Sequence, residues 1–132
     1  MSIISLIKDN TVPWKENEII HVDKHVCLIA DAFPLSKGHM LFVPVQNTPE
    51  LIATCFDHAW KVGKQGVEEN IWQGYNIGMN CGEVAGQTVN YPHVHLIPRY
   101  QNDVEEPRGG IRNFLQNKNI DYINHLKNKN NE

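Results

Sequence analysis

Two histidines stand two residues apart in the segment YPHVHLIPR, which covers residues 91–99. If this segment is a strand, alternation places Tyr91, His93 and His95 on one face, with neighbouring Cα atoms about 6.6 Å apart. Two imidazoles side by side can act as nucleophile and proton donor, form half of a metal site, or be simple surface histidines. The pair by itself therefore leaves three uses open.

Other segments of distinctive composition stand in a fixed order before this pair. They are Asp31-x-x-Pro34, Gly38-His39, Asn80 and the run AGQTV at residues 85–89. Together with the histidine pair they resemble the histidine triad (HIT) superfamily, from about Ile19 to Arg112. Because several motifs agree in order, the resemblance is far more specific than an isolated His-x-His.

The triad motif departs from the family pattern at its first position. Tyr91 stands where the family carries its first histidine, and Pro92 follows at an apolar position. The family's nucleophile is the middle histidine, which corresponds to His93, and the third corresponds to His95. The resemblance therefore implies that both bond-making histidines are retained.

The chemistry expected of this pair follows from imidazole itself. A histidine with an ordinary pKa of about 6.5 is mostly neutral at pH 7, and only a neutral ring can attack phosphorus. Attack by His93 on an α-phosphorus would give a nucleotidyl-histidine and divide one difficult displacement into two easier ones. A neighbour on the same face, His95, is placed to protonate the leaving group.

The resemblance also implies a set of nucleotide-binding residues. Asn80, Gln87 and Thr88, with N–H groups of the glycine loop, would hold the phosphate, and Asp31 would accept hydrogen bonds from ribose hydroxyls. His39 would lie next to the catalytic strand. Ordinary turn chemistry explains the loop residues and Asp31 equally well, and His39 could be a satisfied, partly buried histidine.

Two further residues belong to this expected site. Tyr91 is included among the nucleotide-binding residues because of its place in the motif. Ile29 and nearby apolar side chains are candidates for the base pocket, although core packing explains them as well.

No cofactor or metal is expected. The chain has no P-loop motif, and its three cysteines, Cys27, Cys55 and Cys81, form no CxxC pair, so we expect reduced thiols. Cys81 could join His93 and His95 in a zinc site, but the sequence offers no defined fourth ligand.

The function expected is a nucleotide hydrolase of the phosphoramidase or dinucleoside polyphosphate type, which releases a nucleoside monophosphate from a nucleotide substrate, expected to be a purine nucleotide. His95 favours hydrolysis, because the related transferase branch carries Gln there. Tyr91 supports an alternative, a nucleotide-binding regulatory module with weak or no catalysis. A metal-binding protein is the third possibility.

The elements that position these residues can be read from apolar patterning. Strands are predicted at residues 19–22, 26–30, 39–45, 75–80 and 89–98, with Pro44 marking a bulge, an end or an edge. Thr48-Pro49-Glu50 predicts a helix start, and Leu51, Ile52, Cys55, Phe56, Ala59 and Val62 should face the sheet. Gly63 and Gly66 weaken that helix in its middle.

These elements predict an α+β, HIT-like fold with about five antiparallel strands, one long helix and a short C-terminal helix. Residues 1–112 would form the HIT-like domain, and residues 113–132 a C-terminal extension. A chain of 132 residues is long enough to bury a core as one domain.

Net charge and hydropathy indicate which binding partners and which cellular location to expect. A net charge of −3 gives no electrostatic footprint for long nucleic acid, although Arg99, Arg108 and Arg112 could hold a few phosphates. The N-terminal apolar run is interrupted by Lys8 and Asp9, too early for a signal segment or a membrane span, so a cytoplasmic protein is expected. The family resemblance implies a homodimer.

Overall fold

The computed structural model describes residues 2–130. The chain divides into two compact units, with the boundary between Tyr100 and Gln101, and each unit is described by itself. The larger unit holds all five strands and every residue of the expected site. The sequence-based division after residue 112 stays a prediction.

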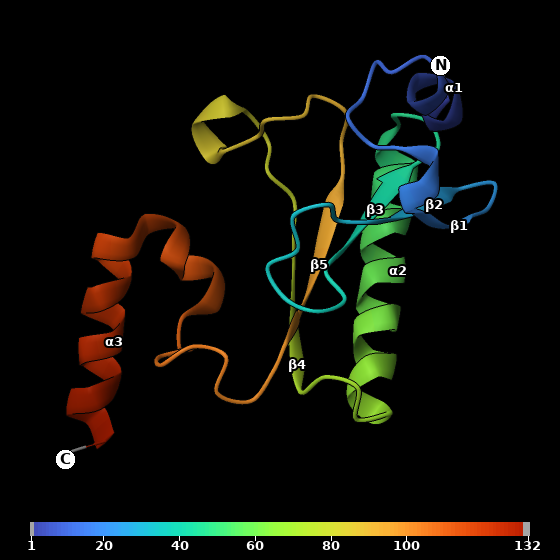
Figure 1. Ribbon diagram of the computed structural model, residues 1–132. Helices are drawn as coiled ribbons and strands as arrows, with labels where there is room; N and C mark the ends of the chain where they lie inside the picture. The colour runs from blue at the N-terminus through green and yellow to red at the C-terminus, as the bar shows by residue number, and fades with distance from the viewer. Residues whose placement is uncertain (1, 131–132) are drawn as a thin grey trace. The chain divides into compact units, whose positions relative to one another are not determined.

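The first unit is built on one five-stranded antiparallel sheet, shown in Figure 1. Its strands lie in the order β1-β2-β3-β5-β4, with the bounds β1 Ile19–Val22, β2 Val26–Ala30, β3 Met40–Pro44, β4 Gly74–Gly78 and β5 Val94–Arg99. The predicted α+β fold with an antiparallel five-stranded sheet is confirmed, and β1 and β2 have the predicted bounds. Pro44 is the last residue of its strand, which is one of the places predicted for it.

Strand β5 begins at Val94, later than the predicted start at residue 89. The side-chain amide of Gln87 donates to the carbonyls of Val89 and Asn90, at 3.0 and 3.1 Å, which gives these backbone groups a partner outside the sheet. Pro92 then has no N–H to contribute to a ladder. The segment before His93 is therefore a bent loop, and His93 lies one residue ahead of the strand.

The long helix α2, Pro49–Glu68, begins where the sequence predicts. The hydroxyl of Thr48 accepts a hydrogen bond from the Leu51 N–H at 3.2 Å and caps the helix. A short helix, α1, Ile3–Lys8, was not predicted, and its first turn is capped by Ser2. The apolar N-terminal run forms this helix because Ile3 and Ile7 lie on one face, and both are buried.

Each face of the sheet carries its own core. On one face, α2 packs Cys55 and Ala59 against Phe42, Val94 and Leu96. On the opposite face, α1 and the segment that follows it pack on alternate residues of β2 and β3, and this second core contains Ile3, Ile7, Val12, Trp14, Cys27, Ile29, Leu41 and Val43. One predicted helix contact differs, because Phe56 is 39% exposed.

The two glycines of α2 have a packing role that the sequence did not reveal. A Cβ at Gly63 would overlap the Tyr75 ring, and one at Gly66 would overlap the Trp72 indole. The Trp72 indole N–H donates to the Gly63 carbonyl at 2.9 Å. Because these glycines have no Cβ, the rings of Tyr75 and Trp72 can pack directly against the backbone of α2.

The second unit contains a short 3₁₀ segment, Gly110–Leu115, and the helix α3, Gln116–Asn130. The predicted C-terminal helix is present; Ile123 is buried, whereas Ile120 and Tyr122 are exposed. Along residues 2–130, none of the helices combines the length and apolar character required of a membrane span.

We predict that Gly66→Ala destabilises the protein by about 1–3 kcal/mol, because the new methyl group must displace the Trp72 indole. The steric cost itself is larger than this net loss, because alanine gains about 1 kcal/mol over glycine in a helix interior. Urea unfolding measures the difference. Gly78→Ala is the control, since a Cβ there meets no heavy atom within 4 Å. A more stable Gly66→Ala protein would contradict the packing role.

Candidate active site

His93 and His95 lie side by side, as strand alternation predicts. Their ring centroids are 5.2 Å apart, with 59° between the ring planes. His95 is in the middle of the sheet, because its strand neighbours are Leu41 of β3 and Gly78 of β4. The central position gives His95 a rigid backbone on both sides.

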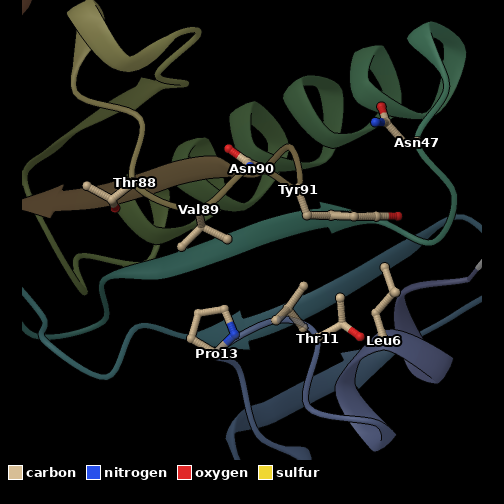
Figure 2. A pocket seen from close by; sticks show the side chains of 9 residues that line it. Leu6, Thr11, Pro13, Asn47, Thr88, Val89, Asn90 and Tyr91 are labelled. Atoms are coloured by element: carbon tan, nitrogen blue, oxygen red, sulfur yellow. The ribbon is translucent and has the colours of Figure 1, made fainter.

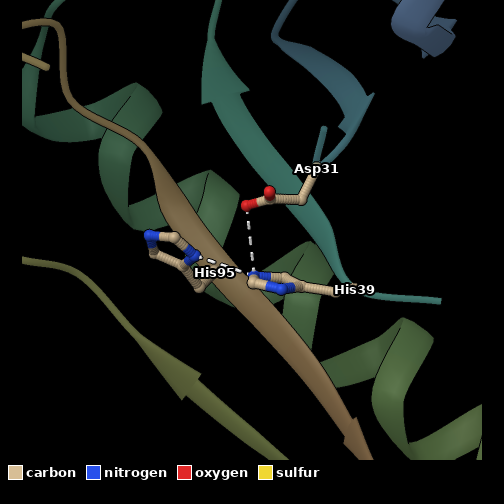
Figure 3. A group of neighbouring side chains, drawn as sticks. All are labelled: Asp31, His39 and His95. Atoms are coloured by element: carbon tan, nitrogen blue, oxygen red, sulfur yellow. Dashed lines mark hydrogen bonds and ion pairs between the residues drawn. The ribbon is translucent and has the colours of Figure 1, made fainter. Parts of the chain in front are cut away.

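His39 and Asp31 join this pair from the connection between β2 and β3. His39 Nε2 lies 3.0 Å from His95 Nδ1 and 3.4 Å from Asp31 Oδ2, as Figure 3 shows. Asp31 directly follows β2 and His39 directly precedes β3, and the Asp31 N–H donates to the His39 carbonyl at 3.2 Å. We call His39, His95 and His93 the histidine row.

The loop between Asp31 and His39 is hydrogen-bonded to β5 and to the residue that follows it. The Ser36 hydroxyl donates to the Pro98 carbonyl, and the Tyr100 hydroxyl donates to the Lys37 carbonyl, both at 2.6 Å. Gly38 has a φ of +93°, a conformation that favours glycine and turns the chain into His39. The loop is therefore held at several points close to the histidine row.

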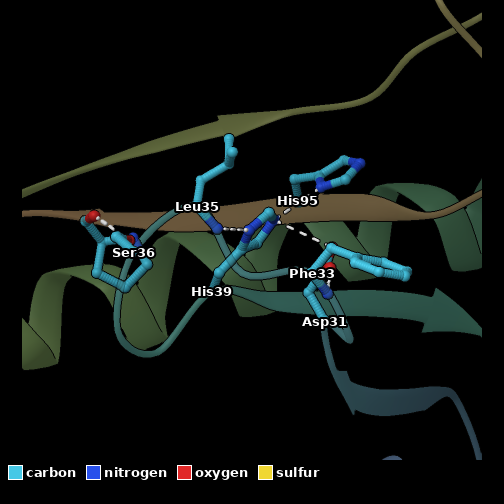
Figure 4. Close-up of polar contacts among 7 residues, drawn as sticks. Asp31, Phe33, Leu35, Ser36, His39 and His95 are labelled. Carbon is cyan, nitrogen blue, oxygen red and sulfur yellow. Dashed lines mark hydrogen bonds and ion pairs between the residues drawn. The ribbon is translucent and has the colours of Figure 1, made fainter.

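The Leu35 N–H determines which nitrogen of His39 carries the proton. This N–H donates to His39 Nδ1 at 3.0 Å, as Figure 4 shows. Because a backbone N–H cannot accept, Nδ1 has no proton, and the neutral ring must carry its proton on Nε2. His39 Nε2–H then donates to His95 Nδ1, so neutral His95 carries its own proton on Nε2.

His93 has the opposite tautomer. Its Nδ1 lies 2.9 Å from the Tyr91 carbonyl oxygen, which only accepts, so Nδ1 carries the proton. The lone pair of neutral His93 is therefore on Nε2. The imidazole is 8% exposed and meets the Trp14 indole in an edge-on contact, with ring centroids 5.2 Å apart. The backbone and Trp14 together restrict rotation of the nucleophile candidate.

Burial keeps the other two rings neutral. Burial lowers the pKa of His95 to about 4, with smaller contributions from His93 and His39, while Asp31 opposes the shift. Burial likewise lowers the pKa of His39, partly offset by Asp31. At pH 7 both rings are therefore neutral, which is the state that the hydrogen bonds from Leu35 and His39 require.

The predicted phosphate-binding residues lie in and beside the glycine loop. The side-chain amide of Gln87 makes all of its hydrogen bonds with backbone groups of that loop. Its Oε1 accepts from the Gly82 N–H at 2.8 Å, and its Nε2 donates to the carbonyls of Val89 and Asn90. Thr88 is exposed. Asn80 is half-buried two residues after β4, and extending the Gly78–His95 register by two residues would place it opposite His93. Gln87 thus shapes the loop that carries Thr88.

The side chains of Tyr91 and Ile29 have partners other than the three histidines. The Tyr91 hydroxyl donates to the Pro44 carbonyl at 2.7 Å, and burial raises its pKa to about 12. Tyr91 acts on His93 through its backbone carbonyl. Ile29 is fully buried in the core beneath α1, which supports the core-packing interpretation of this residue.

A metal ion could reach three groups of the site. Ligand atoms of Asp31, His39 and His95 lie within 4.8 Å of one another. The same contacts are accounted for without a metal ion, because His39 Nε2–H donates to His95 Nδ1 and lies 3.4 Å from the Asp31 carboxylate, which attracts it electrostatically. Cys81 is exposed and outside this group, and Cys27 and Cys55 are buried thiols.

Two contributions to the site were missed by sequence reasoning. Trp14 contacts His93 although about eighty residues separate them in the sequence. The one sequence feature that could have indicated a role for Trp14 is its position as a large aromatic residue in the polar segment PWKENE. The Leu35 N–H carries no side-chain signal at all, because any residue except proline offers the same donor.

Comparison with known proteins identifies the family of this fold. The HIT domain matches residues 13–102. An uncharacterized HIT-like protein of Methanocaldococcus jannaschii is 34% identical over 134 residues, covering 96% of this chain and 97% of the relative. The chain therefore belongs to the HIT domain family.

Two other similarities bear on structure and chemistry. A zinc-bound histidine triad family protein of Mycobacterium smegmatis has a TM-score of 0.63, is 27% identical and covers 77% of each chain. An asymmetrical bis(5′-nucleosyl)-tetraphosphatase of Schizosaccharomyces pombe is 37% identical over 82 residues, or 55% of this chain, which spans only 44% of that enzyme. The family thus includes at least one nucleotide hydrolase by name.

The lowered pKa of His95 predicts a loss of stability in mild acid. Below pH 6.5 the unfolded chain binds a proton at this residue that the folded chain binds only near pH 4. The unfolded state holds more protons in this window, so the free energy of unfolding is largest above pH 6.5 and falls as the pH drops to 4. Urea midpoints between pH 7.5 and 4.5 measure it.

In the same titration His95→Gln should show a shallower decline, with His25→Gln at an exposed position as the control. Equal slopes for His95→Gln and the unsubstituted protein would show that His95 is not kept neutral by the fold.

Proposed function

We propose that this protein is a nucleotide hydrolase that acts through a nucleotidyl-His93 intermediate and releases a nucleoside monophosphate. One observation carries the proposal: the two neighbouring imidazoles are held in complementary tautomers. His93 has a lone pair on Nε2, and His95 has a proton on Nε2. When both rings are neutral, a nucleophile and a hydrogen-bond donor for the leaving group therefore lie next to each other.

In the first step His93 Nε2 attacks the α-phosphorus of the nucleotide. The P–Nε2 bond forms while the bond from phosphorus to the leaving nitrogen or oxygen breaks. His95 Nε2–H donates a hydrogen bond to the leaving atom, which takes its proton from solvent. The modified His93 ring becomes a cation, because Nδ1 keeps its proton. The Tyr91 carbonyl oxygen, 2.9 Å from Nδ1, stabilises this charge.

In the second step water attacks the same phosphorus. The P–Nε2 bond breaks, the nucleoside monophosphate leaves, and the attacking water gives up to solvent a proton that replaces the one taken by the leaving group, so both rings keep their starting tautomers. The His39 hydrogen bond keeps the His95 ring oriented throughout. The cycle is balanced, with water consumed and no oxidant, reductant or metal ion required by the scheme.

The remaining site residues would bind the nucleotide. Asp31 is proposed to accept ribose hydroxyls, since its side chain is 16% exposed and each carboxylate oxygen has lone pairs beyond those used by Phe33 N–H and His39. Asn80, Thr88 and loop N–H groups are proposed to hold the phosphate, with Gln87 shaping the loop. A purine nucleotide remains the expected substrate.

A covalent intermediate is the direct test. Mixing the protein with an adenosine 5′-phosphoramidate and quenching in base should add one AMP to the chain, located at His93 by peptide mass spectrometry. His93→Ala should lose turnover by at least 10³-fold, and His95→Ala by about 10²–10⁴-fold. His58→Ala, on α2, is the control.

Chelation with EDTA should leave this turnover intact, because protein groups alone stabilise the charge in the scheme. Turnover that needs Zn²⁺ or Mg²⁺ would refute the mechanism. Nucleotide binding without measurable turnover would identify the protein as a regulatory binding module.

Tyr91 is predicted to be a positioning residue whose side chain has a small effect on catalysis. Tyr91→His keeps the backbone carbonyl that orients His93, so kcat should change by less than about tenfold, or 1.4 kcal/mol. Tyr91→Phe should cost about 1–3 kcal/mol of stability, since the Pro44 carbonyl loses its donor. A hundredfold gain of kcat in Tyr91→His would show that the natural protein lacks a needed proton carrier.

We also propose a cytoplasmic homodimer. The described cysteines are free thiols, which suits a reducing compartment. Strand β4 is an edge of the sheet, and the neighbouring helix α2 exposes Phe56 and Trp60 by 39% and 49%. Two copies could pair through this edge and cover these side chains. Sedimentation equilibrium should give twice the chain mass, and Trp60→Glu should shift it toward the monomer.

A further inference from the structure

The nucleophile candidate lies just outside the sheet that holds its neighbour. Strand β5 begins at Val94, its pairing with β3 ends at Val94, and its pairing with β4 ends at His95. Within the described residues neither ladder reaches His93, and the residue before it, Pro92, has no N–H to donate. His93 therefore does not share the backbone pairing that makes His95 rigid, and its orientation depends on contacts of the ring itself.

Two contacts orient the His93 ring. Its Nδ1–H donates to the Tyr91 carbonyl at 2.9 Å, and the ring meets the Trp14 indole at a centroid distance of 5.2 Å, with 72° between the planes. The hydrogen bond selects the nitrogen that faces the loop. The indole lies at contact distance and hinders a turn of the imidazole about its Cβ–Cγ bond, which would carry Nδ1 away from the carbonyl and Nε2 away from a substrate.

Trp14 also contacts Tyr91, so that three rings support one another. The centroids of Trp14 and Tyr91 are 6.4 Å apart, with 85° between the planes. The Tyr91 hydroxyl donates to the Pro44 carbonyl at 2.7 Å, which attaches the Tyr91 side chain to the end of β3. We call Trp14, Tyr91 and His93 the ring cluster. The indole therefore packs between the nucleophile candidate and a ring that is itself attached to the sheet.

The N-terminal segment holds Trp14 in this place. Trp14 is 9% exposed and belongs to the same core as the fully buried Ile3. The Ile3 N–H donates to the Val45 carbonyl at 2.8 Å, and the Thr11 N–H donates to the Leu6 carbonyl at 2.9 Å. These bonds attach the start of α1 to the residue after β3 and close the turn that follows the helix. The indole is therefore supported by the core and by the backbone that leads to it.

A cavity of about 540 Å³ separates neighbouring parts of the same two segments. Figure 2 shows residues 11–13 on one side of it and the loop at residues 88–91 on the other. Trp14 directly follows the first segment and contacts the rings of Tyr91 and His93. Replacing the indole with a smaller side chain would enlarge this space and give the imidazole room to turn.

We propose that Trp14 is a positioning residue for the nucleophile. The indole holds the His93 ring with Nδ1–H toward the Tyr91 carbonyl and with the Nε2 lone pair free to attack phosphorus. This role in the reaction rests on the proposed hydrolase function. Because Trp14 acts through His93 and not on the bound nucleotide, it raises the rate of attack and leaves substrate binding unchanged.

Single-turnover kinetics with adenosine 5′-phosphoramidate test the role in the reaction. In Trp14→Leu the maximal rate of AMP–His93 formation should fall by about 10- to 100-fold, while the substrate concentration at half-maximal rate should change by less than about threefold. Trp14→Phe keeps a flat ring against the imidazole and should stay within about fivefold of the unsubstituted rate. Ile3→Ala is the control, because it truncates a fully buried side chain of the same core and keeps all three rings.

The histidine tautomers give a second readout that needs no substrate. In a protein labelled with ¹⁵N at histidine, the nitrogen shifts distinguish Nδ1–H from Nε2–H, and at pH 8 a histidine with an ordinary pKa of about 6.5 is neutral. The unsubstituted protein should show His93 protonated on Nδ1, and Trp14→Leu should show a mixture of both tautomers at this ring. His39 and His95 should keep Nε2–H in both proteins, because the Leu35 N–H is unchanged.

The outcomes separate this role from the proposed function. If the unsubstituted protein does not hydrolyse the phosphoramidate, the hydrolase is refuted, and the nitrogen shifts alone decide whether Trp14 holds His93. An unchanged His93 tautomer in Trp14→Leu, or a rate loss in Ile3→Ala equal to that in Trp14→Leu, refutes the role of the indole. Circular dichroism establishes that each variant is folded, and Trp14→Met is the second aliphatic variant if Trp14→Leu does not fold.

Discussion

The arrangement of the site depends on a hydrogen bond that can run in only one direction. The Leu35 N–H can donate and cannot accept, so its bond to His39 Nδ1 determines the proton position on His39 and, through His39, on His95. A carbonyl oxygen does the converse for His93. Backbone groups at two points therefore assign different protonation patterns to chemically identical side chains.

The fold supplies the rigidity that this assignment needs. His95 is paired on both sides in the middle of the sheet. The connection that carries Leu35 is hydrogen-bonded to β5 through the Ser36 hydroxyl and to the residue after β5 through the Tyr100 hydroxyl. Separate cores on the two faces hold the sheet from both sides. Burial then disfavours the charged form of His95, so that packing and hydrogen bonding favour the same state.

Much of this was predictable from sequence where the signal lies in side chains. The period of two predicted the neighbouring imidazoles, and the Thr48-Pro49 pair predicted the start of α2, because both patterns reflect local geometry. Backbone donors and long-range ring contacts were not predictable. The Leu35 N–H has no residue signature, and Trp14 contacts His93 only through the tertiary fold. Gly63 was predicted only to weaken α2, because the close approach of the Tyr75 ring to this glycine also depends on the tertiary fold.

The contact between Trp14 and His93 has a spectroscopic consequence. An indole 5.2 Å from an imidazole ring senses the charge on that ring, because its emission depends on the local electric field. The other two tryptophans have different surroundings. Trp60 is half-exposed, and the Trp72 indole N–H donates a hydrogen bond to the Gly63 carbonyl of α2, on the opposite face of the sheet from Trp14. In a protein that keeps only Trp14, each change of charge on His93 would therefore produce its own fluorescence signal, without any added label.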